Sequence, residues 1–183
     1  MRIISGVHKG RRLQAPKKLP IRPTTDMAKE GLFNLLQYRL HLQGLRVLDL
    51  FAGSGNISYE FGSRGAESIT AVDQHQGCVR FIQKTSKELA LPIEIVRSAA
   101  RPFLDKNRRQ YDLIFADPPY DFEESVLLEL IEASFAGDTL INDGYFILEH
   151  RPQLDFESHK SFLESRKYGS SVFSFFGKEK EEE

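Results

Sequence analysis

Apolar and polar residues follow two different periods along this chain, and segments of the two kinds alternate. Short apolar runs of strand length are followed by longer stretches in which apolar residues recur every three or four positions, as they do on one face of a helix. The predicted strands cover residues 46–51, 68–73, 93–97, 111–116, 144–150, 160–167 and 171–176. The predicted helices begin at a cap at Thr24, Thr25 or Asp26 and near residue 55, and cover 75–89, 99–106 and 122–135.

This alternation of strands and helices predicts one α/β domain. We expect a doubly wound, mostly parallel sheet of about seven strands with helices on both faces. The last two strands favour an antiparallel hairpin at the C-terminal edge of that sheet, turned at Gly169. We therefore divide the chain into an N-terminal extension (residues 1–22), the α/β domain (23–177) and a charged tail (178–183).

Length and composition limit the class of protein. With 183 residues the chain is long enough for one well-buried domain and too short for two ordinary ones. No apolar run approaches the roughly 18 residues of a membrane span, and the N-terminus lacks the apolar core of a secretory signal. Cys78 is the single cysteine and the histidines lack metal-ligand spacing, so we expect no internal disulfide, no metal site, and a location in the reducing cytoplasm.

Charge is distributed unevenly along the chain. Residues 1–22 contain no acid, so all 26 acidic residues lie in the remainder. A basic segment on an acidic body fits contact with nucleic-acid phosphates, although a solvated basic tail is the alternative. The basic residues of this segment are Arg2, Lys9, Arg11, Arg12, Lys17, Lys18 and Arg22.

The first predicted strand leads into a glycine loop, DLFAGSGN, which opens the next helix. Gly53 and Gly55 permit positive φ angles, and the free N–H groups of the helix favour a polar or anionic ligand. Asp73 ends the second strand, where the dinucleotide fingerprint has an acid that binds ribose hydroxyls. The loop therefore predicts a ligand that contains adenosine.

Two features argue against a nicotinamide cofactor. Ser58 stands in place of the third fingerprint glycine, and Asp49 precedes the loop where a pyrophosphate would be repelled. A ligand with an ammonium or sulfonium group would instead be attracted to that carboxylate. S-adenosylmethionine carries both groups and is the predicted cofactor, with a nicotinamide oxidoreductase as the alternative.

A buried strand in the stretch YDLIFADPPYD stops on an acid, two prolines and a tyrosine. Neither Pro118 nor Pro119 can donate an N–H to a sheet, and each restricts the residue before it. Asp117 and the Pro118 carbonyl are thus fixed acceptors for an exocyclic base amine, and Tyr120 could stack on a base turned out of its helix. The alternative is an ordinary strand-to-loop transition, because Asp-Pro often begins a turn.

These stretches resemble a known family. DLFAGSG resembles the cofactor motif, and DPPY the catalytic motif, of Rossmann-like S-adenosylmethionine-dependent methyltransferases that act on base amines. Together with MRIISGVHKGRRL, RPTTD, LFN and YGSSVFSFF, nearly the whole chain resembles the RsmD family, which methylates guanine N2 in small-subunit (16S) ribosomal RNA. The resemblance implies an enzyme of rRNA processing whose partner is ribosomal RNA or a small-subunit assembly particle, and we expect a monomer.

The resemblance also implies roles for individual residues. Asp49, Ala52, Gly53 and Gly55 would line the methionine part of the cofactor and Asp73 would hold its ribose, with Thr24, Gln74 and Ser98 in the same pocket. Asp117, Pro118 and Tyr120 would be the catalytic residues that grip the guanine. Lys9, Arg11 and Arg12 match a basic, RNA-facing hairpin, and Arg22 and Pro23 match the block beside the substrate entrance.

Some positions depart from the family pattern or stay open. Ser98 stands near a place where the family often has an acid for the adenine amine, and Met27 replaces a frequent arginine. Alternation in the last strand favours core packing for Phe173 and Phe175. Glu149 ends a strand near the presumed site, where a structural ion pair and a functional role are both open.

Two other functions are compatible with the motifs. An adenine N6-methylase acting on DNA or RNA can also carry DPPY. A non-catalytic RNA-binding assembly protein could keep a vestigial cofactor pocket.

Overall fold

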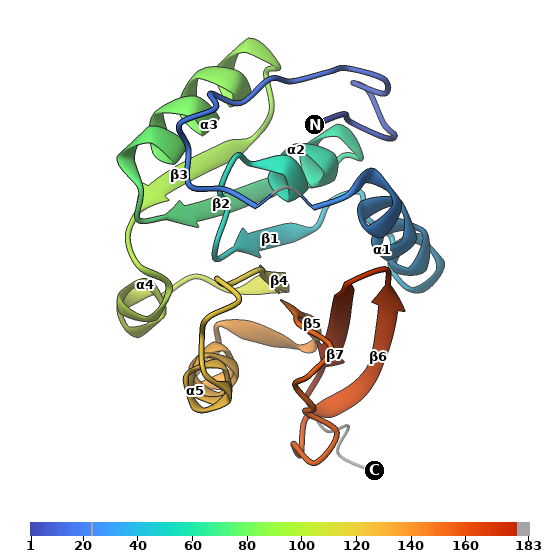
Figure 1. Ribbon diagram of the computed structural model, residues 1–183, viewed down its shortest axis with the longest axis vertical. Helices are drawn as coiled ribbons and strands as arrows, with labels where there is room; N and C mark the ends of the chain where they lie inside the picture. Colours follow the sequence, from blue (N-terminus) through green and yellow to red (C-terminus); the bar gives the residue numbers. More distant parts are fainter. Residues whose placement is uncertain (23, 179–183) are drawn as a thin grey trace.

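The protein has a layered α/β architecture in a computed structural model that describes residues 1–22 and 24–178 (Figure 1). Within these residues one sheet has seven strands, in the order β3-β2-β1-β4-β5-β7-β6. The strands are β1 (Arg46–Asp49), β2 (Ser68–Asp73), β3 (Ile93–Arg97), β4 (Tyr111–Ala116), β5 (Leu140–His150), β6 (Phe162–Tyr168) and β7 (Ser171–Phe176). Strands β1 to β5 pair in parallel, and β7 is antiparallel to both β5 and β6. The predicted fold class is confirmed.

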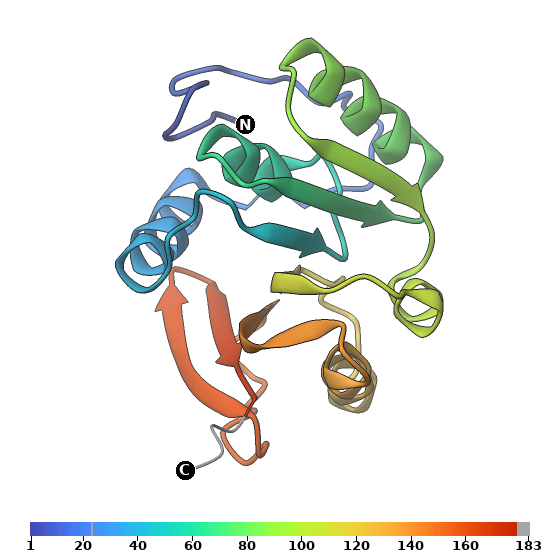
Figure 2. The same cartoon turned by 180° about the vertical axis from the view of Figure 1, so that it is seen from behind.

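Helices cover both faces of the sheet (Figures 1 and 2). The helices are α1 (Asp26–Arg39), α2 (Asn56–Ser63), α3 (Gln76–Glu88), α4 (Ala100–Lys106) and α5 (Glu124–Phe135). Side chains of a strand point alternately to the two faces, so Leu113 and Phe115 pack with α1 and α2, whereas Ile114 packs with α4 and α5. Phe173 and Phe175 are fully buried on the α1 side, as predicted from their alternation.

Three strands differ in their bounds from the sequence prediction: β1, β5 and, by one or two residues at each end, β6. Strand β1 ends at Asp49, two residues before the predicted end. The N–H of Leu50 donates to Phe115 of β4, whereas the N–H of Ala52 donates to Val72 of β2. Residues two apart in a regular strand would donate to the same neighbouring strand, so the backbone turns between Leu50 and Ala52. Strand β5 begins earlier than predicted, at Leu140, which pairs with Tyr111 of β4. The register then shifts before Tyr145 pairs with Leu113, so residues 141–144, which include the turn-forming Asn142, form an irregular part of the strand.

The N-terminal segment contains the expected basic hairpin. Arg2 and Arg12 form an antiparallel bridge, and the N–H of Ile3 donates to the carbonyl of Arg11 at 2.9 Å. Ile3 is buried in a cluster with Tyr59 of α2, whereas Lys9 is exposed at the tip. The hairpin thus has a packed apolar side and a basic outer side.

A buried ion pair joins this hairpin to the helices. Lys29 of α1 is inaccessible to solvent, and its Nζ lies 3.2 Å from Oε2 of Glu60 in α2. Lys29 also donates to the carbonyl of Arg2, and Glu60 accepts from the N–H groups of Ile4 and Ser5 at 2.9 and 3.0 Å. The hairpin backbone therefore supplies part of the hydrogen bonding of each buried charge, beside Asn56 for Lys29 and Arg64 for Glu60.

The boundary between an extension and a domain at residue 22 stays a prediction. Pro23 and residues 179–183 of the predicted tail lie outside the described residues.

Candidate active site

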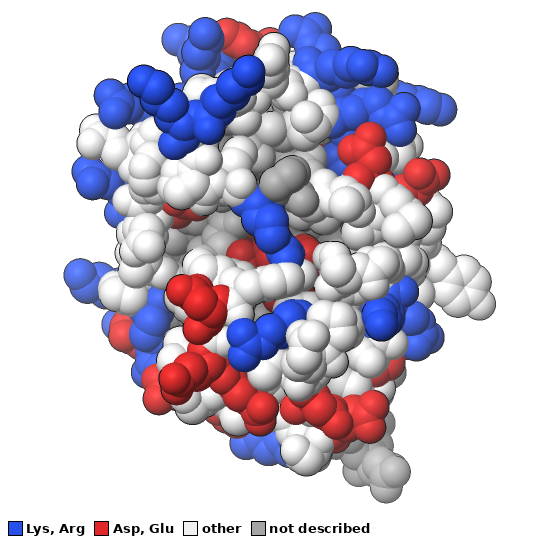
Figure 3. Space-filling view, viewed as in Figure 1, with Lys and Arg blue, Asp and Glu red and all other residues white. Residues whose placement is uncertain are grey.

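A cavity of about 1200 Å³ opens beyond the carboxyl ends of the parallel strands, where ligands bind in doubly wound sheets. Asp49, Asp73 and Asp117, from the ends of β1, β2 and β4, line it. Leu13 and Ile21 of the N-terminal segment contribute a second wall that the sequence motifs did not indicate. Figure 3 shows the cavity as a hollow near the middle of this face, with acidic atoms in its floor.

Asp49 is a buried carboxylate at the base of the cavity. Its Oδ2 accepts a hydrogen bond of 2.7 Å from the Ser58 hydroxyl, and its Oδ1 has no hydrogen-bond partner among the described residues. Burial raises the pKa of Asp49 to about 7, and the nearby Asp73 carboxylate adds to this effect. A cation in the cavity would therefore stabilise the ionised form of Asp49. Ser58, which replaces the third fingerprint glycine, holds this side chain.

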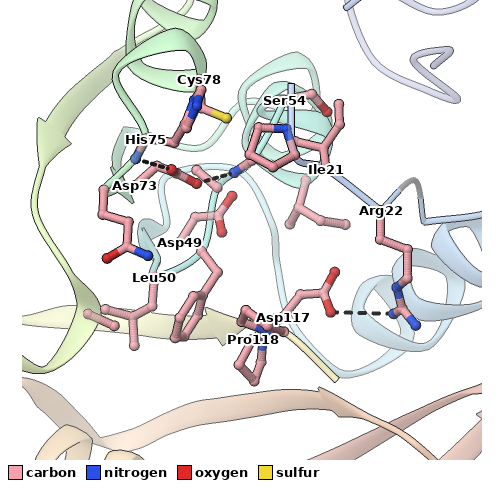
Figure 4. A pocket seen from close by; sticks show the side chains of 18 of the residues that line it. Ile21, Arg22, Asp49, Leu50, Ser54, Asp73, His75, Cys78, Asp117 and Pro118 are labelled. Atoms are coloured by element: carbon pink, nitrogen blue, oxygen red, sulfur yellow. Dashed lines mark hydrogen bonds and ion pairs between the residues drawn. The ribbon is translucent and has the colours of Figure 1, made fainter. Parts of the chain in front are cut away.

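Asp73 connects the glycine loop to the start of α3 (Figure 4). Its Oδ2 accepts from the N–H of Gly53 and its Oδ1 from the N–H of His75, both at 2.8 Å. Gly53 lines the cavity, but Gly55 is not among the described residues that do. Gly55 has φ +84°, and a Cβ there would lie 2.5 Å from the Tyr59 ring, so the structure gives it a conformational role behind the loop.

The other residues predicted for the cofactor line the same cavity. They are Thr24, Ala52, Gln74 and Ser98. The Ser98 hydroxyl donates to the carbonyl of Ala99 at 2.9 Å. Cys78 also lines the cavity, and burial raises the pKa of its thiol to about 11, which keeps it protonated near neutral pH.

The DPPY stretch forms another part of the wall, immediately after β4. Asp117, Pro118 and Tyr120 all line the cavity. The Arg22 guanidinium lies over the Tyr120 ring, 3.3 Å from its centroid. Arg22, which was predicted to lie beside the substrate entrance, thus covers one face of the Tyr120 ring, which was predicted to stack on the base.

Glu149, at the end of β5, completes a charged group with Asp117 and Arg22. The Arg22 terminal nitrogen Nη2 lies 2.9 Å from Glu149 Oε1 and 3.6 Å from Asp117 Oδ1 (Figure 4 shows the Asp117 contact). Burial and the charge of Glu149 raise the pKa of Asp117 well above its usual value, and Arg22 opposes the shift. Burial likewise raises the pKa of Glu149. The guanidinium of Arg22 therefore contacts two carboxyl groups.

The basic side chains of the hairpin lie outside the cavity. Lys9, Arg11 and Arg12 are exposed and are not among the described residues that line it. Figure 3 shows Lys and Arg side chains gathered over the upper part of this face and Asp and Glu over its lower part. Met27, the departure noted in the sequence, is an exposed residue of α1.

The described ranges, 1–22 and 24–178, include no helix with the length and apolar character needed to cross a membrane. They also include no cluster of three His, Cys, Asp or Glu placed to hold a metal ion.

Comparison with known proteins places the chain in a family. The family model described as "Conserved hypothetical protein 95" matches residues 1–177. A putative rRNA methyltransferase, YlbH of Bacillus subtilis, is 36% identical over 160 residues, which are 85% of each chain. The ribosomal RNA small subunit methyltransferase D of Escherichia coli is 35% identical over 145 residues, which cover 77% of this chain and 72% of that relative.

The chain belongs to the RsmD family. A solved structure from Escherichia coli described as a putative methyltransferase, yhhF, superposes on this RsmD-family protein with a TM-score of 0.85, 27% identity and 98% of each chain covered. A 16S rRNA N2-guanine methyltransferase (RsmC) of Thermus thermophilus, solved with AdoMet and guanosine, gives a TM-score of 0.70 at 26% identity, over 88% of this chain and 45% of that one. The Rossmann-like fold of S-adenosylmethionine-dependent methyltransferases is thereby confirmed.

Proposed function

We propose that this RsmD-family protein transfers a methyl group from S-adenosylmethionine to the N2 amine of a guanine in small-subunit ribosomal RNA. The observation that carries the proposal is one cavity lined both by Asp49 and Asp73 and by Asp117 to Tyr120. A cofactor site and an acceptor for a base amine are thus adjacent. The substrate is ribosomal RNA or a small-subunit assembly particle, and the protein acts as a monomer.

The residues of the cavity fit the cofactor. Asp49, with an unpartnered buried oxygen among the described residues, suits the positive charge of the methionine moiety. Asp73 keeps acceptor capacity for ribose hydroxyls after its two backbone contacts. When bound, S-adenosylmethionine supplies a methyl group activated by its sulfonium. The rest of the cofactor would lie against other residues of the same cavity, namely Ala52, Gly53, Gln74, Ser98 and Thr24.

The role of the DPPY stretch is to hold the amine. Asp117 and the Pro118 carbonyl accept the N2 hydrogens, which directs the nitrogen lone pair toward the methyl group. The C–N bond forms as the C–S bond breaks, and the amine then loses one proton to solvent. Tyr120 stacks on the base.

Product analysis tests the function. Methyl transfer from labelled S-adenosylmethionine to small-subunit particles and to total RNA from a strain lacking this gene is expected to give N2-methylguanosine. N6-methyladenosine would overturn the proposal in favour of an adenine methylase. Cofactor binding without any label would favour the non-catalytic RNA-binding alternative.

We further propose that residues 1–22 are an RNA-binding extension of a methyltransferase domain formed by residues 23–177. Replacing Lys9, Arg11 and Arg12 together by alanine is expected to weaken RNA binding and to reduce the slope of log K against log salt by about 0.7–0.9 per lost phosphate contact. S-adenosylmethionine affinity should be unchanged, because these side chains lie outside the cavity. RNA affinity is measured by filter binding at several salt concentrations.

The matched control replaces three exposed lysines of other segments, Lys106, Lys160 and Lys167. It removes the same charge from elsewhere on the molecule. An equal loss of RNA affinity in both triple variants would show that net charge, rather than the hairpin, governs binding.

A further inference from the structure

The Arg22 guanidinium lies in the cavity between an aromatic ring and two carboxylates. Its guanidinium stacks 3.3 Å from the centroid of the Tyr120 ring, and its Nη2 contacts the carboxylates of Glu149 and Asp117. A guanidinium is a flat N–C–N unit whose edge consists only of hydrogen-bond donors. The N1–H, C2 and N2 amine of guanine form the same kind of unit. The arginine therefore has the shape and the donors of that edge.

The surroundings of Glu149 require such a donor. Its side chain is inaccessible to solvent; Oε1 accepts from the Ser171 hydroxyl at 2.8 Å, and Oε2 has no partner in the described part of the chain. If Arg22 moved away, a single neutral hydroxyl would remain to stabilise a buried carboxylate. Leaving a buried charge so poorly satisfied is costly, so the departure of Arg22 favours either a new donor beside Glu149 or protonation of its carboxyl group, whose pKa burial raises.

We propose that Glu149 is a guanine-recognition residue: its carboxylate accepts the N1–H of the target guanine beside the N2 amine held by Asp117, in the place that Arg22 fills until the base enters. This inference rests on the proposed function and deepens it. Adenine carries a lone pair at N1, which a carboxylate repels. Glu149 would thus discriminate guanine from adenine. Asp117 does not, because both purines carry an exocyclic amine whose N–H it could accept.

Nucleoside binding to the full chain, saturated with S-adenosylhomocysteine, tests the role of Glu149. The wild-type protein is expected to bind guanosine about 10- to 100-fold more tightly than 1-methylguanosine, which keeps the N2 amine but lacks the N1–H, as expected for a hydrogen bond to a charged group. In Glu149→Ala this ratio should fall close to one, and in Glu149→Gln, which keeps one acceptor, it should be intermediate. Unchanged S-adenosylhomocysteine affinity shows that each variant is folded.

Arg22→Ala tests the second half of the inference. Removing a side chain that competes for the site is expected to tighten guanosine binding several-fold. The matched control is Arg39→Ala, which removes an arginine paired with Glu164 at the C-terminal end of α1 and should leave guanosine affinity unchanged. Weaker guanosine binding by Arg22→Ala, or none, would overturn the inference, because Arg22 would then hold the base itself.

The outcomes separate this inference from the proposed function. If the product is N2-methylguanosine but the wild type binds guanosine and 1-methylguanosine equally, the function stands and the role of Glu149 is overturned. If the wild type binds adenosine in preference to guanosine and makes N6-methyladenosine, both are overturned.

Discussion

Replacing Asp117 by alanine is expected to reduce the rate of methyl transfer by about 10²- to 10³-fold, as the loss of one positioned hydrogen-bonding group in an active site typically does. The reason is that Asp117 lies at the end of β4, beside the cofactor part of the cavity, where it would hold the base amine. S-adenosylmethionine affinity should stay close to wild type, because Asp49 and Asp73 are untouched. Single-turnover rates and a cofactor titration measure the two quantities separately.

The control is Asp121→Ala, which removes an exposed acid next to the same motif. Its rate should remain close to that of the wild type. The pH dependence gives a second check, because Asp117 accepts hydrogen bonds with full strength only when ionised. Burial and Glu149 raise the pKa of Asp117, so kcat/KM should fall on acidification at a pH above the usual range of an aspartate. Undiminished methyl transfer by Asp117→Ala would contradict the proposed role.

Replacing Asp49 by asparagine is expected to have two opposite effects. It should weaken S-adenosylmethionine binding by about 10- to 100-fold, because a buried carboxylate facing a cation is lost. It should also stabilise the protein without ligand at pH 8 by about 2–4 kcal/mol, since the folded pKa of about 7 lies some 3 units above the usual value. Calorimetric titration gives the affinity, and denaturant unfolding gives the free energy.

The sign of the stability effect follows from proton binding. Between the usual pKa of an aspartate and about 7, the folded protein holds a proton on Asp49 that the unfolded chain has lost. The contribution of Asp49 to the free energy of unfolding therefore decreases as pH rises through that window. Wild-type affinity for the cofactor should conversely decrease below about pH 7, when Asp49 becomes protonated, and Asp49→Asn should lack this dependence.

Ser58→Ala is the matched control for Asp49→Asn. It removes the hydrogen bond to Oδ2 and keeps the carboxylate, so the pKa of Asp49 should rise and the loss of cofactor affinity should begin at a higher pH. Wild-type cofactor affinity in Asp49→Asn would show that this carboxylate does not face the cation.

The sequence by itself determined the order of the elements and the edge of the sheet that holds the site. Apolar runs and helical periodicity are local properties, and they predicted each strand and the start of each helix of the described chain within a few residues. Because the carboxyl ends of parallel strands share one edge, Asp49, Asp73 and Asp117 could be brought together without any structure. The start of β5 was missed because Asn142 and its neighbours have turn composition, whereas in the structure they form an irregular part of a strand that begins at Leu140, paired with Tyr111 of β4.

Only the tertiary structure decided which charges meet. Arg22, Asp117 and Glu149 lie in a connecting segment and at the ends of two different strands, and nothing in their local patterns indicates that one guanidinium contacts both acids. The same holds for Lys29 and Glu60, whose buried pair joins the hairpin to two helices. The physical reason is that a periodic pattern reports which face of one segment is buried. A buried charge must be satisfied by whatever segment lies against it, and that depends on how the whole chain packs.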